Sequence, residues 1–213
     1  MTQTIQAKTL TLLDVETKFN FQLCEDEQFF REWIDDLPEI TDDKKRSLDN
    51  VKAGYINSVK YAMLEDTVKM VVLAPLLFLA DFYLTPFHIE AEKSVELTIE
   101  DEDIIVRGSI DVLLLLKSFW VVAIEAKRSQ YSVEAGLPQL LFYMLNDPSP
   151  EQVIFGLLTN GSSFRFIKVT KQGTPQYAVS KLFDIESPGN ELYEVFRILK
   201  RLASIISSNI SST

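Results

Sequence analysis

Phe119-Trp120-Val121-Val122-Ala123-Ile124-Glu125-Ala126-Lys127 is the most apolar strand candidate in the chain, and charge enters it only at the end. A strand that is apolar on both faces is typical of the middle of a sheet covered on both sides. Because strand side chains alternate, Glu125 and Lys127 are expected on one face and Ala126 on the other. Burying such charges is costly unless they are paired or bind an ion, which makes this strand end a candidate site.

The segment before this strand carries a second acidic residue in an apolar setting. Ile104–Leu116 is rich in Ile, Val and Leu, and Asp111 lies between Ile110 and Val112. Lys117-Ser118 predicts a tight turn, so the strand containing Asp111 is expected to pair with the strand containing Glu125. The sequence therefore predicts that the Asp111 and Glu125 carboxylates converge.

The rest of the chain alternates between helical and strand patterns. Residues 1–24 are mixed polar and β-branched around Thr9–Leu13, which indicates either a short edge strand or an arm packed on the body. Apolar residues recur at helical spacing, and Thr41-Asp42-Asp43 is typical of a helix start. Asn160-Gly161 favours a hairpin turn. The expected helices are Glu25–Leu37, 41–65, 65–79, Ser132–Leu145 with Pro138 kinking it or delaying its start, and a C-terminal helix from Gly189-Asn190 to Ile206; the other expected strands are His88–Ile99, Val153–Leu158 and Phe164–Val169.

These elements predict an α/β fold with a central mixed sheet flanked by helices. We expect an N-terminal arm and helix over 1–40, a core domain over 41–185, and a C-terminal helix with a frayed tail over 186–213. A chain of 213 residues suits one domain with appendages, and 46% hydrophobic residues are enough for a sizeable core. This composition excludes wholesale disorder and disulfide-dense miniproteins.

Charge and cysteine content exclude several classes of function. The formal net charge is −10, which argues against a general nucleic-acid coat protein, although it leaves room for a local basic groove or a metal-mediated site. One cysteine, Cys24, and one histidine, His88, cannot build a Cys/His zinc centre, so any metal needs oxygen ligands. The N-terminus lacks a secretion signal, and the longest apolar stretch, Met70–Ala80, is interrupted by Pro75. We therefore expect a cytoplasmic protein with no membrane segment.

Two convergent carboxylates form a hard oxygen site that suits Mg²⁺, with Mn²⁺ as a substitute. Mg²⁺ typically takes one or two protein carboxylates, keeps several waters and draws further ligands from substrate phosphates. Lys127 would then help to lower the pKa of a metal-bound water or stabilise charge on the scissile phosphate. The reaction class is metal-assisted hydrolysis of a phosphodiester, and no small-molecule organic cofactor is expected.

At this point the residues resemble a known family. Asp111, a run of 13 residues and then Glu125-Ala126-Lys127 resemble the Asp-Xn-(Asp/Glu)-X-Lys signature of the PD-(D/E)XK nuclease superfamily, with Ile110 in place of the signature's Pro. Gln139-Leu140-Leu141-Phe142-Tyr143 matches the Gln-X-X-X-Tyr element of several branches, and Gln139 and Tyr143 lie one helical turn apart. Glu65-Asp66-Thr67-Val68-Lys69 is similar to the first core helix of the N-terminal nuclease domain of type I restriction enzyme R subunits.

The resemblance covers roughly Glu65 to Val169 and implies a restriction-endonuclease-like core and an endodeoxyribonuclease that uses a metal-activated water. In that family's pattern Asp111 and Glu125 hold the metal, the Ala126 carbonyl adds a ligand and Lys127 acts on the attacking water. Glu65 assists the metal directly or through water. Gln139 and Tyr143 support the site or touch the DNA backbone, and Arg128 is a candidate phosphate contact. A homodimer is consistent with cutting both strands of a duplex.

Several residues keep a purely structural alternative. Asp111 can be a capped carboxylate at a turn or strand end, Glu125 with Lys127 a solvated strand end, and Tyr143 a core residue. His88 is taken as structural because it has no visible partner. Scattered basic residues can line a phosphate-facing groove or simply solvate the surface; they are Lys44-Lys45-Arg46, Lys52, Lys60 and Lys117. The competing function is a catalytically inactive nuclease-fold relative that acts as a scaffold or partner-binding subunit.

Overall fold

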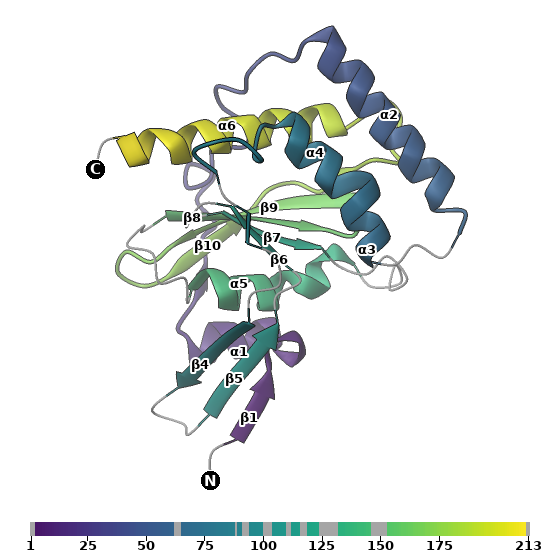
Figure 1. Cartoon of the computed structure of the whole chain (residues 1–213). Helices are drawn as coiled ribbons and strands as arrows, with labels where there is room; N and C mark the ends of the chain where they lie inside the picture. Colours follow the sequence, from purple (N-terminus) through teal and green to yellow (C-terminus); the bar gives the residue numbers. More distant parts are fainter. Residues whose placement is uncertain are drawn as a thin grey trace.

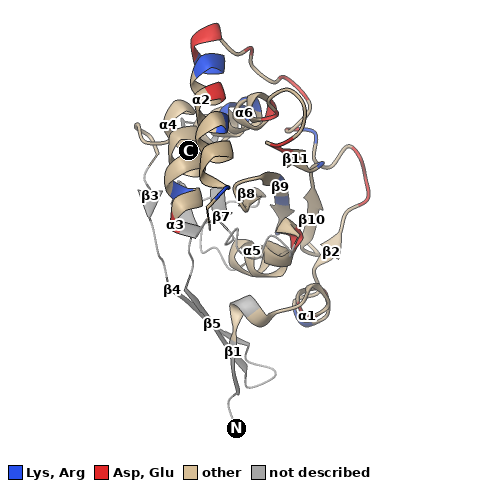
Figure 2. Ribbon diagram, turned by 90° about the vertical axis from the view of Figure 1, so that its right-hand side faces the viewer, with Lys and Arg blue, Asp and Glu red and all other residues tan. Residues whose placement is uncertain are grey.

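A mixed sheet with helices on both faces forms the framework of the structure, a computed structural model (Figures 1 and 2). It describes residues 3–61, 65–87, 89–90, 94–99, 104–109, 112–115, 119–123, 132–145 and 153–211. The strands are β1 (Gln3–Gln6), β2 (Gln22–Leu23), β3 (Ile89–Glu90), β4 (Ser94–Ile99), β5 (Ile104–Ser109), β6 (Val112–Leu115), β7 (Phe119–Ala123), β8 (Val153–Thr159), β9 (Ser163–Thr170), β10 (Gln176–Val179) and β11 (Phe183–Asp184). This architecture confirms the predicted α/β class.

Two sheets are formed by these strands. The larger sheet has the order β2-β10-β9-β8-β7-β6-β3, and β11 adds to β9; the smaller has the order β1-β5-β4. Within the larger sheet β7 and β8 run parallel, whereas β6 and β7 run antiparallel. The central position of β7, between β6 and β8, agrees with its apolar sequence.

Helices cover both faces of the larger sheet. They are η1 (Ala7–Thr9), α1 (Leu12–Lys18), α2 (Asp42–Ser58), α3 (Glu65–Val68), the π-helical segment η2 (Lys69–Leu73), α4 (Ala74–Leu79), η5 (Val133–Gly136), α5 (Leu137–Leu145) and α6 (Leu192–Ser211). Figure 2 shows α2, α4 and α6 on one side of the sheet and α5 on the other. The parallel connection from β7 to β8 passes through η5 and α5, as parallel pairing requires.

Alternation along β8 separates the core into two apolar clusters. Phe155 and Leu157 point to the cluster that contains α2, α4 and α6, while Ile154 and Leu158 point to the cluster built around α5. All four side chains are nearly or completely buried. Since both faces of this strand are covered, polar chemistry on β8 is confined to its ends.

Most of the expected elements are confirmed. Helix α2 begins after Thr41, whose hydroxyl accepts a hydrogen bond from the Lys44 N–H. Pro138 delays the start of α5, which begins at Leu137 after the short helix η5. Strands β8 and β9 pair on either side of Asn160-Gly161, and α6 is the predicted C-terminal helix.

The predicted helix over Glu25–Leu37 is wrong. This segment consists of short turns, and Asp36 lies in the left-handed region with φ of 52°. In an α-helix the Phe29 carbonyl would accept from Trp33, but here it accepts from Lys168 Nζ at 2.6 Å. The aromatic side chains instead dock on the core, where Phe30 is buried and Trp33 packs against the cluster. Tertiary contacts therefore replace the helical hydrogen bonds.

Three strand expectations also need correction. The expected strand His88–Ile99 divides between the larger sheet, which contains β3, and the smaller sheet, which contains β4. Ile104–Leu116 is not one strand, because β5 belongs to the smaller sheet and β6 to the larger one. Residues 110 and 111, between them, lie outside the described residues. Near the N-terminus the strand is Gln3–Gln6, whereas Leu12 and Leu13 begin α1, whose Thr11–Asp14 capping box satisfies the first turn.

Gly156 on β8 allows close contact between the sheet and α5, and it gives the first test of the packing. A β-carbon there would lie 2.8 Å from Met144 Sδ and 3.0 Å from Leu140 Cδ2. We expect Gly156→Ala to lower the free energy of unfolding by about 1–3 kcal/mol in urea melts, because the neighbours must shift. Gly54→Ala is the matched control, since its β-carbon would meet only Val71 at 3.5 Å. Because Gly54 lies in the middle of α2, Gly54→Ala should raise the free energy of unfolding by up to about 1 kcal/mol. Equal effects of the two variants would contradict the close packing.

Candidate functional site

Three strand ends meet at one edge of the larger sheet. Ala123 at the end of β7 pairs with Thr159 at the end of β8, so these parallel strands finish together. Val112, which begins β6, lies opposite Val122 of β7. The ends of parallel strands are the usual place for ligands in open α/β sheets. We call this edge the candidate edge.

The residues with the strongest chemical prediction adjoin this edge in the sequence. Asp111 directly precedes β6, and Glu125, Ala126, Lys127 and Arg128 follow β7. All five lie outside the described residues, as does His88, so their predicted roles stay predictions.

Helix α3 packs against the turn between β8 and β9, which lies at the same edge. A β-carbon on Gly161 would lie 3.1 Å from both γ-carbons of Val68, the last residue of α3. Glu65 begins α3, one turn before Val68, and Figure 1 shows α3 beside this end of the sheet. The structure therefore brings the helix that carries Glu65 to the edge where β7 and β8 end.

The turn that contacts Val68 is held by its own polar groups. The Gly161 N–H donates to Thr159 Oγ1 at 3.0 Å, and Asn160 Oδ1 accepts from the backbone N–H groups of Ser162 and Ser163. Gly161 has φ of 90°, a conformation that side chains strongly disfavour. A rigid turn at this place fixes the position of α3 against the sheet.

Tyr55 of α2 also packs on this turn, with its Cε2 3.6 Å from where a β-carbon on Gly161 would lie. Its hydroxyl donates to Glu186 Oε1 at 2.7 Å, and only 3% of the residue is exposed. Burial, followed by the hydrogen bond and charge of Glu186, raises the pKa of the Tyr55 hydroxyl above its ordinary value. Tyr55 thus links α2, the β8–β9 turn and the loop before α6.

Gln139 and Tyr143 lie together on α5, as their spacing predicts. Gln139 Nε2 donates to the Tyr143 hydroxyl at 3.0 Å. Tyr143 has no exposed surface and belongs to the cluster around α5, whereas Gln139 is partly exposed. This burial favours support of the sheet over direct contact with nucleic acid for Tyr143.

One ion pair near the candidate edge was not predicted. Arg165 of β9 approaches Glu134 of η5 with 2.5 Å between Nη1 and Oε1, and its Nε donates to the Ser180 carbonyl at 3.0 Å. The pair anchors η5, the element that follows residues 124–131, to the sheet. Ser132, which caps η5 by accepting from the Glu134 N–H, gives a local sequence signal, but the partner Arg165 lies 31 positions away and gives none.

The basic residues of α2 serve the fold. Lys44 Nζ donates to the Leu79 carbonyl at 2.8 Å, and Lys52 Nζ donates to the carbonyls of Ser187 and Gly189. Lys45 and Arg46 pair with Asp42 and Asp43. These contacts tie α2 to its neighbours and do not favour the phosphate-facing groove considered from the sequence.

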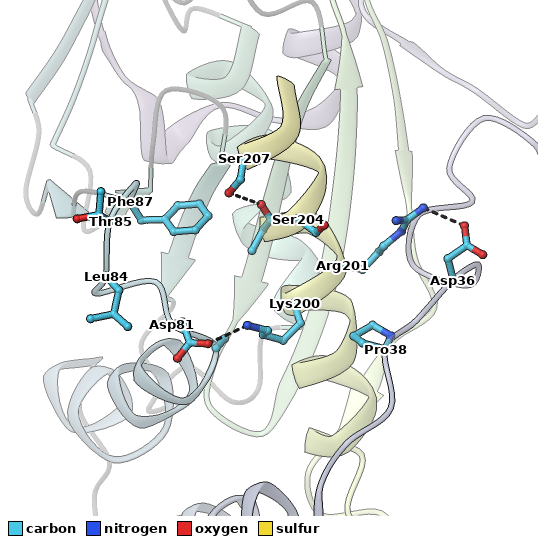
Figure 3. A pocket seen from close by; sticks show the side chains of 12 residues that line it. Asp36, Pro38, Asp81, Leu84, Thr85, Phe87, Lys200, Arg201, Ser204 and Ser207 are labelled. Atoms are coloured by element: carbon cyan, nitrogen blue, oxygen red, sulfur yellow. Dashed lines mark hydrogen bonds and ion pairs between the residues drawn. The ribbon is translucent and has the colours of Figure 1, made fainter. Parts of the chain in front are cut away.

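A pocket of about 520 Å³ lies elsewhere, over the second half of α6 (Figure 3). Lys200 pairs with Asp81 at 2.8 Å and Arg201 with Asp36 at 3.0 Å. Figure 3 shows these two cations pointing to opposite sides of the helix. Asp81 follows α4, at the opposite end of the α3–η2–α4 helix from α3, and the pocket holds none of the predicted site residues.

Neither the comparisons with known proteins nor the arrangement of possible metal ligands in the described residues assigns a function to the chain. No model of a known protein family matches the chain, and no curated protein matches its sequence. In the described ranges no group of three His, Cys, Asp or Glu residues is arranged to hold a metal ion. Within the same ranges no helix has the length and apolar character needed to cross a bilayer.

The raised pKa of Tyr55 predicts a loss of stability in alkali. The unfolded chain loses this proton above about pH 10, whereas the folded chain keeps it, so stability is complete below pH 10 and falls as the pH rises beyond it. Tyr55→Phe should cost about 1 kcal/mol at neutral pH and flatten the alkaline decline, measured by urea melts at stepped pH. Tyr177 lies in the other cluster, where burial and the hydrogen bond to Glu16 raise its pKa in the same way. Tyr177→Phe is therefore the matched comparison and should also flatten the alkaline decline. A Tyr55→Phe profile parallel to wild type up to the highest pH would contradict this assignment.

The Gln139–Tyr143 contact predicts a structural effect. Tyr143→Phe removes the acceptor of the Gln139 amide and should lower the free energy of unfolding by about 0.5–1.5 kcal/mol. The measurement is a urea melt, with Phe142→Leu as a packing control in the same buried turn. No loss in Tyr143→Phe, with a loss in Phe142→Leu, would show that the hydrogen bond contributes nothing to stability.

Proposed function

We propose that this chain is a divalent-metal-dependent nuclease with a restriction-endonuclease-like core that hydrolyses phosphodiester bonds in DNA. The observation that carries the proposal is the antiparallel register of β6 and β7, in which Val112 lies opposite Val122. Asp111 is one residue before Val112, and Glu125 is two residues after Ala123. This register of the neighbouring described residues supports the proposal that the two carboxylates converge.

The position of α3 supports a third carboxylate at the same edge. Val68 touches the turn at the end of β8, and Glu65 lies one helical turn before it. Helix α3 is distant in sequence from the neighbouring strands β6 and β7, and all three elements approach one edge. Such convergence is typical of a site built by the fold and is not required by packing alone.

The donor set suits a hard cation. The carboxylates of Asp111 and Glu125 and the carbonyl of Ala126 are oxygen ligands of the kind that Mg²⁺ takes, with Glu65 as a further donor. When bound, Mg²⁺ supplies a more acidic water and stabilises negative charge on a phosphate. The Lys127 ammonium would hold the scissile phosphate and offset the charge that develops on it, and Arg128 would contact a neighbouring phosphate.

DNA is the substrate that the proposal names, and a homodimer would place two centres on a duplex. The charge of −10 and the paired basic residues of α2 leave little general affinity for phosphates. Figure 2 shows acidic residues gathered between β2 and α2, on the side away from α3. Contact with DNA would therefore be local to the candidate edge.

The second candidate function is an inactive relative of the nuclease fold that binds a partner. The acidic net charge is the observation that favours it, because a nucleic-acid enzyme more often presents a basic surface. The carboxylates and the lysine required for catalysis are all present in the sequence, which favours the enzyme.

A plasmid-cleavage assay tests the proposal. Supercoiled DNA is incubated with the protein in Mg²⁺, in Mn²⁺ or in EDTA, and nicked and linear products are resolved on gels. Cleavage should require the metal and should fall about 100-fold or more in Asp111→Ala and Lys127→Ala. Asp66→Ala and Lys60→Ala are matched controls, since they remove exposed charges of the same kind.

Metal titration separates the two candidate functions. Calorimetry with MgCl₂ alone should show binding in wild type and loss of binding in Glu125→Ala. Wild-type protein that neither binds metal nor cuts DNA or RNA would eliminate the enzyme and leave the binding subunit. Equal cleavage by wild type and by Lys127→Ala would remove the lysine from the mechanism.

A further inference from the structure

Four large apolar side chains are exposed along η2, α4 and the turn that follows α4. Met70 is 74% exposed and Phe78 66%. One π-helical turn and one regular turn together span about eight residues, so Met70 and Phe78 lie on the same side of this helix. In the turn after α4, Tyr83 and Leu84 are also exposed, and the Tyr83 ring centroid lies 6.2 Å from that of Phe78. We call these four residues the apolar ridge.

A hollow adjoins the ridge. The pocket of about 520 Å³ over α6 includes Leu84 in its lining, so the ridge and the hollow share a residue. Helix α6 contributes Ser204 and Ser207, whose small side chains leave this space open (Figure 3). Phe87 lines the opposite side, and its ring is fixed 4.8 Å from the ring of the buried Phe82. The ridge and the hollow therefore form one surface, which we call the α4–α6 surface.

Charge on the α4–α6 surface is balanced, in contrast to the chain as a whole. The net charge is −10, and the segment 25–43 holds nine acidic residues and one basic residue. In the hollow, by contrast, Lys200 pairs with Asp81 and Arg201 with Asp36. Two copies of an acidic chain repel each other unless they meet at a face without net charge. The α4–α6 surface is such a face.

The shape of this surface suits a second copy of the chain. A contact with two-fold symmetry uses the same patch on both copies, so the patch must be complementary to itself. A projecting ridge beside a hollow meets this requirement, because a half-turn brings the ridge of each copy over the hollow of the other. A basic partner would instead be attracted to the acidic segment 25–43.

The area of the ridge sets the expected strength of the contact. Taking roughly 200 Å² for each large side chain, the ridge exposes on the order of 500 Å² of apolar surface. Two copies that bury their ridges would remove about 1,000 Å² from water, which is near the lower limit for a specific interface. The expected dissociation constant is therefore about 1–100 µM.

We propose that the α4–α6 surface is the interface of a two-fold homodimer, in which Phe78 and Tyr83 of each copy enter the hollow over α6 of the other. The inference goes beyond the proposed function, since it assigns a face to the contact between copies and requires no nuclease activity. It gives a role to exposed side chains that neither the core nor the candidate edge uses.

Sedimentation velocity over about 1–200 µM protein tests the interface. Wild type should shift from monomer to dimer across this range, and Phe78→Glu with Tyr83→Glu should weaken the dimer about 30-fold or more, because it places like charges in the contact. Leu13→Glu with Leu23→Glu is the matched control, since it adds the same charge at exposed apolar residues of α1 and β2. This control should keep the wild-type dissociation constant within about twofold.

A second variant tests the hollow independently of the ridge. Ser204→Trp fills the hollow from an exposed position and should also weaken the dimer about 30-fold or more, whereas Thr17→Trp, at an exposed position of α1, should not. If the ridge variant does not fold, Ser204→Trp decides. A wild type that stays monomeric to 200 µM would overturn the proposal, and so would a dimer that persists in Ser204→Trp or in a folded ridge variant.

Mixing the two variants tests the pairing of ridge with hollow. The ridge variant keeps its hollow and Ser204→Trp keeps its ridge, so a mixed dimer retains one of the two contacts. An equimolar mixture should therefore associate about 5-fold or more tightly than either variant alone. A mixture that associates no better than its components would overturn the pairing. Plasmid cleavage is not a readout in these experiments, so their outcome is independent of whether the chain is a nuclease.

Discussion

Burial of the central strands on both faces is the constraint on which the rest of the structure depends. Strand β8 sends Phe155 and Leu157 into one apolar cluster and Ile154 and Leu158 into the other. Gly156 lets α5 approach closely enough to close the second cluster. A sheet covered in this way leaves no room for charged chemistry on its faces, so candidate functional residues must gather where strands end.

The sequence predicts those parts of the fold in which local pattern and tertiary environment agree. In three places a local preference agrees with the tertiary structure: the apolar run of β7 lies between β6 and β8, Asn160-Gly161 joins β8 to β9, and Thr41 caps α2. The prediction fails for Glu25–Leu37 because its aromatic spacing reflects docking on the core. Lys168 donates to the Phe29 carbonyl, which would accept an intrahelical hydrogen bond in a helix. These residues are 139 positions apart, so no local sequence pattern predicts the contact.

The candidate site also has features that the sequence predicts and contacts that it does not. The sequence alone proposes acidic and basic site residues next to the strand ends, and the spacing of Gln139 and Tyr143 predicts their contact. It gives no sign of the contact between Val68 and Gly161 or of the Arg165–Glu134 pair, because each joins residues that come together only when the sheet forms. These contacts set where α3 and η5 lie, and thus decide which residues reach the candidate edge.

The π-helical segment η2 has one turn that holds an extra residue, since the Ala74 N–H donates to the Lys69 carbonyl, and this turn lets one continuous helix meet two packing requirements. The α4 half must present its apolar stripe to the core, and the α3 half must present Val68 to the β8–β9 turn. For an unbroken α-helix both directions follow from a single phase, and in this sequence that phase would bring Lys69 to the core. One extra residue in the turn separates the two requirements, since α4 keeps its stripe while α3 takes a different rotation. Packing of Val68 on the rigid β8–β9 turn then holds that rotation, so the conformation of a few backbone atoms connects the core to the candidate edge.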